Sequence, residues 1–402
     1  IEMLARADVL CLDKTGTITD GTMHVTDVLP LGDATDEEIT AAMACIEGAE
    51  ESINNTSRAL IDRFGRTEGL TVTERVPFSS ERKYSAVSAE GAGIFSLGAP
   101  HFVKAPVDEE TDRKIAAYAA KGERVLLLAK HDKIDTVGVP MALIAIADRI
   151  RPNAGETIRG FQEQGVTIKI ISGDHAATVS SIAKRVGVLH AEKYLSCEGL
   201  SDERLVAEAE NYTVFGRVTP EQKVLLIKTL RKNGHTVAMT GDGVNDTLAL
   251  KESNCAIAMA DGSSVASKVS QIVLTNSDFA TLPDVVREGR RCINNVRMSA
   301  VLFLMKTFFT IGLSLYAVAT FSGYPLQPKD LMLIETIIIG IAAVLLALEP
   351  NNKRIEGSFI STVIRRSLPN AIALLLPAIA LVVLRDTGVI DAATCSAMVM
   401  SA

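Results

Sequence analysis

The residues Asp13-Lys14-Thr15-Gly16-Thr17-Ile18-Thr19 follow directly on a short apolar run, Val9–Leu12. An uninterrupted apolar run of this length predicts a strand buried inside a parallel sheet. Asp13 is then expected at the carboxyl end of that strand, where open α/β sheets bind their ligands. An aspartate there can act as a nucleophile toward phosphorus, and the backbone N–H groups and hydroxyls that follow can hold phosphate oxygens. The alternative is an ordinary strand with a polar turn.

A second polar segment follows another apolar run. The run is Val237–Thr240, and it leads into Gly241-Asp242-Gly243-Val244-Asn245-Asp246. Such a loop at a strand end suits Mg²⁺, which prefers hard oxygen ligands together with a substrate phosphate. The alternative is a loop rich in Asp and Asn that binds no metal. The presence of the Asp13 segment in the same chain argues against this alternative.

Two smaller pieces complete the set. The apolar run Ile168–Ile171 ends in Ser172-Gly173-Asp174, so a hydroxyl stands at a third predicted strand end. Lys223 lies in Thr219-Pro220-Glu221-Gln222-Lys223, where Pro220 favours a helix start. Taken alone, these residues also fit a turn serine and a solvated helix lysine.

The composition limits the possible partners. The net charge is −7, tryptophan is absent and aromatic residues make up 4% of the chain, which argues against a nucleic-acid surface. The six cysteines are scattered without a CxxC pair. This spacing predicts reduced thiols in place of a zinc site or a disulfide framework.

Long apolar stretches concentrate near the carboxyl end of the chain. They are residues 301–321, 331–348 and 368–384, and each is close to the length that crosses a bilayer. Buried core helices are the alternative. Arginines precede the first stretch, and Lys and Arg lie between the second and third, so the part before the first stretch is expected to face the cytoplasm.

DKTGT, SGD, TPEQK and TGDGVND, in this order, resemble the P-type ATPases of the haloacid dehalogenase superfamily. The resemblance implies that ATP phosphorylates Asp13. It also implies that Asp242 and the carbonyl of Thr15 bind Mg²⁺ at the phosphorylated Asp13. Three further roles are implied for sets of residues. Ser172, Lys223 and Thr15 would hold phosphoryl oxygens. Asn245 and Asp246 would orient the acyl phosphate and the metal. Lys14, Gly173 and Asp174 belong to the same catalytic motifs.

The chemistry of these residues agrees with that assignment. Negative charge spreads over the phosphoryl oxygens during transfer, and fixed donors, a lysine and a metal stabilise it. The family also has an actuator domain and several membrane helices ahead of the nucleophile. The sequence is therefore expected to be a C-terminal fragment of a longer pump.

The segment between the first two motifs is predicted to be an inserted α+β domain. The strand that carries Asp13 is expected to end near Met23. Helices are predicted at 36–46 and 57–64, and strands at 72–76, 84–88, 93–97, 125–130 and 141–147. In the family this insertion binds the nucleotide.

Five residues of this chain resemble the family's nucleotide contacts. Phe78, in a segment that ends at Lys83, would stack on adenine. Gly98 lies in a loop that departs from the family pattern, with Leu97 in place of a lysine and His101 in place of a glutamate. This departure puts nucleotide affinity and base selectivity in question. Arg124 and Arg151 would reach the phosphates, and Arg151 would stand at the hinge that leads back.

Helices and strands alternate again after residue 153, which argues for a parallel sheet covered by helices. The expected fold is a Rossmann-like phosphorylation domain with an inserted nucleotide-binding domain, followed by transmembrane helices. The predicted domains are 1–23 and 148–297 for phosphorylation, 24–147 for nucleotide binding and 298–402 for the membrane.

The predicted function is ATP-driven transport of a cation across a membrane through an aspartyl phosphate. ATP and Mg²⁺ are the expected cofactors, and the bilayer of a prokaryotic plasma membrane is the expected location. Glu335 is the candidate ion ligand, since charged residues within membrane spans are usually functional; Lys306 is expected to pair with it or to extend to the interface. Residues 337–340 lack the further acidic residue expected from calcium and sodium pumps. Calcium is the first candidate cargo among cations other than heavy metals. The alternatives are a lipid flippase, a polyamine pump, a soluble phosphatase or phosphomutase, and a regulatory ATP-binding protein without turnover.

Overall fold

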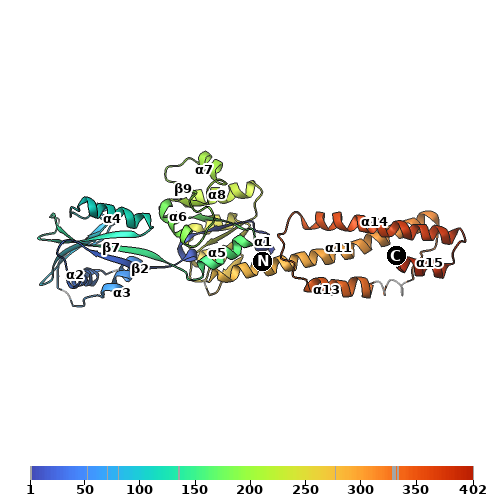
Figure 1. Cartoon of the computed structure of the whole chain (residues 1–402), viewed down its shortest axis with the longest axis horizontal. Helices are drawn as coiled ribbons and strands as arrows, with labels where there is room; N and C mark the ends of the chain where they lie inside the picture. Colours follow the sequence, from blue (N-terminus) through green and yellow to red (C-terminus); the bar gives the residue numbers. More distant parts are fainter. Residues whose placement is uncertain are drawn as a thin grey trace. The chain divides into compact units, whose positions relative to one another are not determined.

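The computed structural model describes residues 2–401 except 52, 70, 80, 135, 277, 328–331, 333 and 334, and the side chain of residue 338. The chain forms two compact units. One comprises residues 7–281, and the other comprises residues 1–6 together with 282–402. The first contains two β-sheets, and the second is helical (Figure 1).

The first sheet is parallel throughout and has seven strands. Strand β1 (Val9–Leu12) lies in its middle between β8 (Thr167–Ile171) and β11 (Val237–Gly241). The remaining strands extend to both sides in the order β13-β12-β11-β1-β8-β10-β9. They are β9 (Tyr194–Ser196), β10 (Val214–Gly216), β12 (Cys255–Met259) and β13 (Ile272–Leu274).

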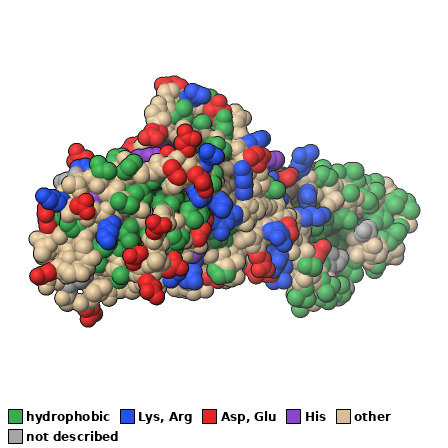
Figure 2. Space-filling view, turned by 60° about the vertical axis from the view of Figure 1, so that its left-hand side comes forward, with side chains coloured by type: hydrophobic (Ala, Val, Ile, Leu, Met, Phe, Trp, Pro, Cys, Tyr) green, Lys and Arg blue, Asp and Glu red, His purple; other side chains and the backbone are tan. Residues whose placement is uncertain are grey.

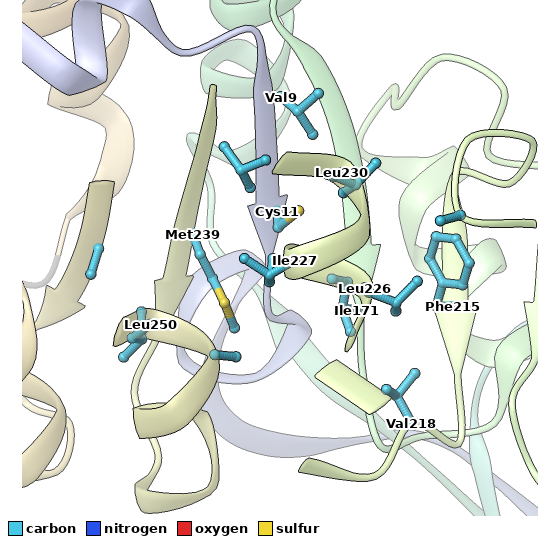
Figure 3. Close-up of a cluster of buried hydrophobic side chains, with 14 of the residues drawn as sticks. Val9, Cys11, Ile171, Phe215, Val218, Leu226, Ile227, Leu230, Met239 and Leu250 are labelled. Atoms are coloured by element: carbon cyan, nitrogen blue, oxygen red, sulfur yellow. The ribbon is translucent and has the colours of Figure 1, made fainter. Parts of the chain in front are cut away.

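Helices cover this sheet and create its core. They are α5 (Ala154–Glu163), α6 (Ala176–Arg185), α7 (Asp202–Glu208), α8 (Pro220–Lys232), α9 (Thr247–Glu252) and α10 (Ser264–Val269). All four residues of β1 are buried, as expected for a central parallel strand. Side chains of β1, β11 and α8 meet in one apolar cluster, where Cys11, Met239 and Ile227 lie close together (Figure 3). The core therefore fixes the position of the residue that follows Leu12.

The chain turns sharply after β1. The turn Lys14–Ile18 is closed by the backbone N–H of Thr19, which donates to the carbonyl of Lys14, while Thr15 is extended and Gly16 has φ +73°. The next strand, β2 (Thr19–Pro30), joins the second sheet instead of continuing the first. The expectation that the Asp13 strand ends near Met23 was therefore wrong. Asp13 follows the last residue of the strand, and Met23 lies inside β2.

The second sheet is antiparallel and has six strands in the order β2-β7-β6-β5-β4-β3. The five predicted strands are present as β3 (Val72–Val76), β4 (Tyr84–Ala89), β5 (Gly93–Gly98), β6 (Arg124–His131) and β7 (Val139–Ile150). Helices α2 (Asp36–Ala49) and α3 (Asn55–Phe64) contribute to one apolar cluster of this sheet. Helix α4 (Glu109–Ala120), which was not predicted, packs against another.

Several elements run through the predicted domain boundaries. Strand β2 passes residue 23, and its partner β7 passes residue 147. Helix α11 (Leu282–Thr320) passes residue 297 without a break. The boundaries themselves stay a prediction.

Among the described residues, two helices are long and apolar enough to cross a membrane, Phe279–Thr320 and Phe359–Asp386, and from residue 282 onward both belong to the helical unit. The first comprises the short helix η3 (Phe279–Thr281) and α11, and the second is α14. The two pack closely, since a Cβ on Gly312 would collide with the side chain of Leu375. Shorter helices complete the unit: α1 (Glu2–Arg6), η4 (Glu335–Ile341), α13 (Ala342–Leu348) and α15 (Ala392–Ser401).

Two of the three predicted spans lie within these long helices. The stretch 301–321 coincides with the end of α11, and 368–384 lies within α14, which includes Pro369 and Pro377. The stretch 331–348 is helical from residue 335 onward. Its residues 331, 333 and 334 lie outside the described residues.

Candidate functional site

Asp13 lies at the carboxyl end of the central strand, where the sequence placed it. Its side chain is buried, with 8% of the residue exposed. Oδ1 accepts a hydrogen bond of 2.8 Å from the backbone N–H of Lys14, and the backbone N–H of Asp13 donates to Oγ1 of Thr240 at 3.3 Å. These contacts hold the carboxylate in one orientation at the strand edge.

Lys223 joins two buried carboxylates at this edge. Its Nζ lies 3.3 Å from Oδ2 of Asp13 and 2.6 Å from Oδ1 of Asp246. The lysine projects from α8, whose start is fixed by a capping box between Thr219 and Gln222. A side chain near the first turn of that helix is thereby aimed at the strand end.

The pKa values of these groups reflect burial and mutual charge. Burial raises the pKa of Asp13 to about 7, with Asp246 and Asp242 adding to the rise and Lys223 opposing it. Burial also raises the pKa of Asp242, and the charge of Asp246 adds to it. Burial alone would lower the pKa of Lys223, but Asp13 and Asp246 outweigh it and raise that pKa.

Oxygen atoms of Asp13, Asp242 and Asp246 lie within 4.8 Å of one another. Three carboxylates at this spacing repel each other, and a divalent cation with hard oxygen ligands would relieve that repulsion. Glycines make the close approach possible. A Cβ on Gly16 would collide with the Asp242 carboxylate, and one on Gly262 would collide with the Asp242 backbone.

A cavity of about 270 Å³ opens over this cluster. Nine residues predicted from the sequence line it, so the structure brings four separate motifs to one place. They are Asp13, Thr15, Ser172, Gly173, Asp174, Lys223, Asp242, Asn245 and Asp246. Ser172 is buried, and its Oγ accepts a hydrogen bond of 3.2 Å from the Asp174 N–H.

Lys14 differs from the other predicted catalytic residues, because it is not part of this lining. Its ammonium is buried and pairs with the carboxylates of Asp148 and Asp174. Burial acts to lower the pKa of Lys14, but the two carboxylates outweigh it and raise it. Lys14 is therefore a positioning residue that ties the Asp13 turn to β7 and to the loop after β8. Asp148 shares that role.

A larger cavity of about 930 Å³ is lined mostly by residues of the antiparallel sheet and of the helices and loops beside it, together with Arg217, which follows β10 of the parallel sheet. Four of the five predicted nucleotide contacts line it: Phe78, Lys83, Gly98 and Arg124. Phe78 is not a core residue, since 56% of the residue is exposed. Nζ of Lys83 lies over the ring of Phe102 at 4.6 Å, and Nη1 of Arg124 donates to Oγ1 of Thr56 at 3.1 Å.

Arg151 lies elsewhere, beside the Asp13 turn. Its Nη2 donates to the carbonyl of Gly16 at 3.0 Å, and its backbone N–H donates to the carbonyl of Ile18. Its Nε is buried without a hydrogen-bond partner among the described residues. Arg151 therefore holds the turn after Asp13 in this structure.

Glu47 is a residue of the larger cavity that sequence reasoning missed. It comes from α2, and only 2% of the residue is exposed. Burial raises its pKa to about 7, and its Oε2 has no hydrogen-bond partner among the described residues. Glu47 lies in a helix with ordinary amphipathic spacing, so nothing in the sequence indicates that its carboxylate is buried beside a cavity.

The predicted ion ligand Glu335 pairs with Lys306. The pair joins η4 to α11 within the helical unit. Pairing of these two side chains was one of the two expectations for Lys306. Each charge is thereby partly neutralised by the other.

Comparisons with known proteins agree with the geometry. A family model described as haloacid dehalogenase-like hydrolase matches residues 7–254. The chain is 40% identical to a probable cation-transporting ATPase, exp7, of Streptococcus pneumoniae, over 92% of this chain and 50% of that protein. It is 39% identical to the calcium-transporting ATPase CtpE of Mycolicibacterium smegmatis, over 92% of this chain and 48% of that protein. The chain thus spans about half the length of the curated relatives it matches.

The fold is also similar to solved structures. A crystal structure of a zinc-transporting PIB-type ATPase in the E2.Pi state matches with a TM-score of 0.59 and 21% identity, over 93% of this chain and 51% of that one. At this identity the match concerns the fold alone.

Proposed function

Because the chain belongs to the haloacid dehalogenase-like hydrolase family, and within it to the P-type ATPases, we propose that it drives cation transport by ATP through an aspartyl phosphate on Asp13. The observation that carries the proposal is the bridge from Lys223 to Asp13 and Asp246 at the end of the central strand. A lysine placed between two buried carboxylates can neutralise the charge of a phosphoryl group transferred to one of them.

In the proposed reaction, a carboxylate oxygen of Asp13 attacks the γ-phosphorus of ATP. A bond forms between that oxygen and phosphorus, the bond from phosphorus to the bridging oxygen of ADP breaks, and ADP leaves. The ammonium of Lys223, the hydroxyl of Ser172 and the Thr15 segment hold the transferred oxygens. Water then cleaves the acyl phosphate and releases inorganic phosphate, which restores the Asp13 carboxylate.

The residues present fit a magnesium ion. Asp13, Asp242 and the Thr15 carbonyl would hold it, and Asn245 and Asp246 would orient the phosphate beside it. When bound, Mg²⁺ would neutralise charge on the phosphoryl oxygens. Asp246 is already paired with Lys223, which favours Asp242 as the second carboxylate ligand.

The cavity of the antiparallel sheet is the proposed site for ATP. A volume of about 930 Å³ lies in the range of cofactor-sized pockets. Phe78 offers an exposed aromatic face for adenine, and Arg124 offers a guanidinium for phosphate. Gly98 also lines the cavity and has room for no side chain, because a Cβ there would collide with Tyr84, so the loop would contribute its backbone.

The cargo is proposed to be a cation other than a heavy metal, with calcium first. Three features support this: the names of the bacterial relatives, the Glu335–Lys306 pair and the two long apolar helices. We place the protein in a prokaryotic plasma membrane, with residues 7–281 on the cytoplasmic side. The basic residues in the first part of α11 and of α14, ahead of their apolar stretches, support that orientation.

The experiment that tests the cargo measures Mg²⁺-dependent, acid-stable labelling from γ-labelled ATP. It uses membranes that contain the full-length protein and a panel of Ca²⁺, Mn²⁺, Na⁺, K⁺ and Zn²⁺. Stimulation by Ca²⁺ alone is expected. Stimulation by Zn²⁺ alone would contradict the exclusion of heavy metals. Labelling indifferent to every ion would favour a lipid or polyamine cargo instead.

A further inference from the structure

Acidic side chains are spread over the surface of the unit that contains the two sheets (Figure 2), but Glu47 is buried. The residue comes from α2, is 2% exposed and forms part of the wall of the cavity of about 930 Å³. Its Oε2 has no hydrogen-bond partner among the described residues. A buried acceptor without a partner is unfavourable. A ligand in the cavity that brings a hydrogen-bond donor to Glu47 would remove that penalty.

The basic residues in and beside this wall leave Glu47 without an ion-pair partner, because four of them have other partners. The pairs are Arg75 with Glu50 and Glu51, Arg66 with the carbonyl of Glu50, Arg124 with Thr56, and Lys83 with the ring of Phe102. Burial raises the pKa of Glu47 to about 7. A hydrogen bond from Ser57 and the charge of Arg66 oppose the rise, and the charge of Glu50 adds to it. Below about pH 7 the carboxyl group is therefore mainly neutral.

The side chain of Glu47 can present either oxygen to the cavity. The residue already forms part of the wall, and the last torsion of a glutamate side chain is broad and nearly two-fold. A neutral carboxyl group offers one O–H donor and one carbonyl acceptor side by side. Adenine has the complementary pair along one edge, an amino donor next to the ring acceptor N1. The amide of glutamine pairs with adenine through two hydrogen bonds of the same kind.

Guanine presents different groups along that edge, namely the acceptor O6, the donor N1–H and a further amino group. An ionised carboxylate only accepts hydrogen bonds, so it would suit the two donors of guanine and would repel the lone pair on N1 of adenine. A neutral carboxyl group would leave the extra amino group of guanine without a partner from Glu47, which is costly at a buried wall. The protonated form of Glu47 therefore favours adenine.

We propose that Glu47 selects adenine over guanine in this cavity, through two hydrogen bonds between its carboxyl group and the amino group and N1 of the base. The inference rests on the ATP site given under the proposed function and names the residue that chooses the nucleotide. Phe78 lines the same cavity and would stack on the face of the base while Glu47 pairs with its edge. This arrangement provides a source for the base selectivity that the departures at Leu97 and His101 put in question.

Binding of the β,γ-methylene analogues of ATP and GTP to the purified chain in a mild detergent tests the proposal. Isothermal titration calorimetry would measure both Kd values at about pH 6 and about pH 8, one unit on either side of the pKa of Glu47. The phosphates of the two analogues titrate alike, so the ratio of the Kd values reports on the base. Wild type is expected to favour the ATP analogue at least about tenfold at the lower pH. This preference should shrink severalfold at the higher pH, where the carboxyl group ionises.

Two substitutions at position 47 separate hydrogen bonding from packing. Glu47→Gln keeps a donor and an acceptor at every pH, so it should retain the adenine preference and lose its pH dependence. Glu47→Met keeps a side chain of similar length without either group, and it should lose the preference. Both variants remove a buried carboxyl group with an unpaired oxygen, so both are expected to fold. Glu37→Gln, at an exposed position on the same helix, is the control and should match wild type.

The opposite results would overturn the proposal in distinguishable ways. Binding of neither analogue to wild type would overturn the ATP site itself. Binding of both analogues with equal affinity, or an adenine preference that survives in Glu47→Met, would overturn the role of Glu47 and leave the ATP site standing. The same pH dependence in wild type and Glu47→Gln would also overturn it, because another group would then be the one that titrates.

Discussion

Gly16 and Asp242 approach each other so closely that no side chain fits at position 16. The Asp242 carboxylate occupies the place of the missing Cβ, and Gly16 has φ +73°. The backbone of the loop at Gly16 therefore contacts the carboxylate of the Asp242 loop, which is far away in the sequence. This contact holds the proposed Mg²⁺ ligand beside the proposed nucleophile.

Gly16→Ala should abolish labelling by moving Asp242. A displacement of about 1 Å in a reacting geometry costs about a hundredfold in rate, so Mg²⁺-dependent labelling from γ-labelled ATP is expected to fall at least that much. Gly21→Ala is the matched control, since Gly21 has φ +80° with nothing within 4 Å. It shares the backbone strain without the collision and should keep its labelling. Equal labelling in the two variants would contradict the role of this contact.

Lys223→Gln should impair both labelling and stability. Removal of one partner from a buried ion pair costs about 3 kcal/mol or more, and loss of a fixed charge at a reacting phosphoryl group costs about a hundredfold. Lys228→Gln, on the same helix, breaks only a surface pair with Glu252 at 3.6 Å and should lose less than about 1 kcal/mol. Thermal unfolding and initial labelling rates measure the two effects. Wild-type labelling by the Lys223 variant would refute its proposed role.

Glu47→Gln should stabilise the protein at neutral and higher pH. The native pKa of Glu47 is about 7 against an ordinary 4.5, so the folded form binds the proton more tightly than the unfolded chain. Stability contributed by this residue is therefore present below pH 4.5 and is lost as the pH rises to about 7. Above pH 7 the variant should gain about 1–3 kcal/mol. Melting temperatures across pH test this, with exposed Glu74→Gln as control. A pH-independent difference would exclude Glu47 as its source.

Glu335→Gln should remove the ion response while the site chemistry stays intact. The change deletes a carboxylate within the apolar helices and leaves Lys306 without its partner. In the full-length protein, ion-stimulated labelling from ATP is expected to disappear, whereas labelling from inorganic phosphate continues. Glu349→Gln, at the residue that follows α13, is the control. An unchanged ion response in Glu335→Gln would rule that residue out as a ligand.

The residues proposed to be catalytic could be found in the sequence because most of them follow an apolar run that forms a strand, and Lys223 lies in the first turn of a capped helix. Local apolar runs predict strands before Asp13 and before the Asp242 loop. In the parallel sheet these strands, β1 and β11, are neighbours, so the two polar segments meet at one edge. The predicted fold class is confirmed.

The rest depends on contacts between distant residues. Lys14 carries no signal that its partners are Asp148 and Asp174 instead of a ligand, because the pairing exists only after β7 returns beside the Asp13 turn. Strand β2 was missed since its exposed polar residues have no clear core face until β7 pairs with it. The burial of Arg297 likewise reflects packing of the helices and not its neighbours in sequence.

Site mapping of the acid-stable phosphate on Asp13 tests the central claim most directly. The chain would be incubated with γ-labelled ATP and Mg²⁺, quenched in acid and digested, and the labelled peptide identified by mass spectrometry. The account predicts hydroxylamine-sensitive label on the peptide that contains Asp13, and none in Asp13→Asn although that variant still binds ATP. Label on another residue, or persistent acid-stable label in Asp13→Asn, would contradict it.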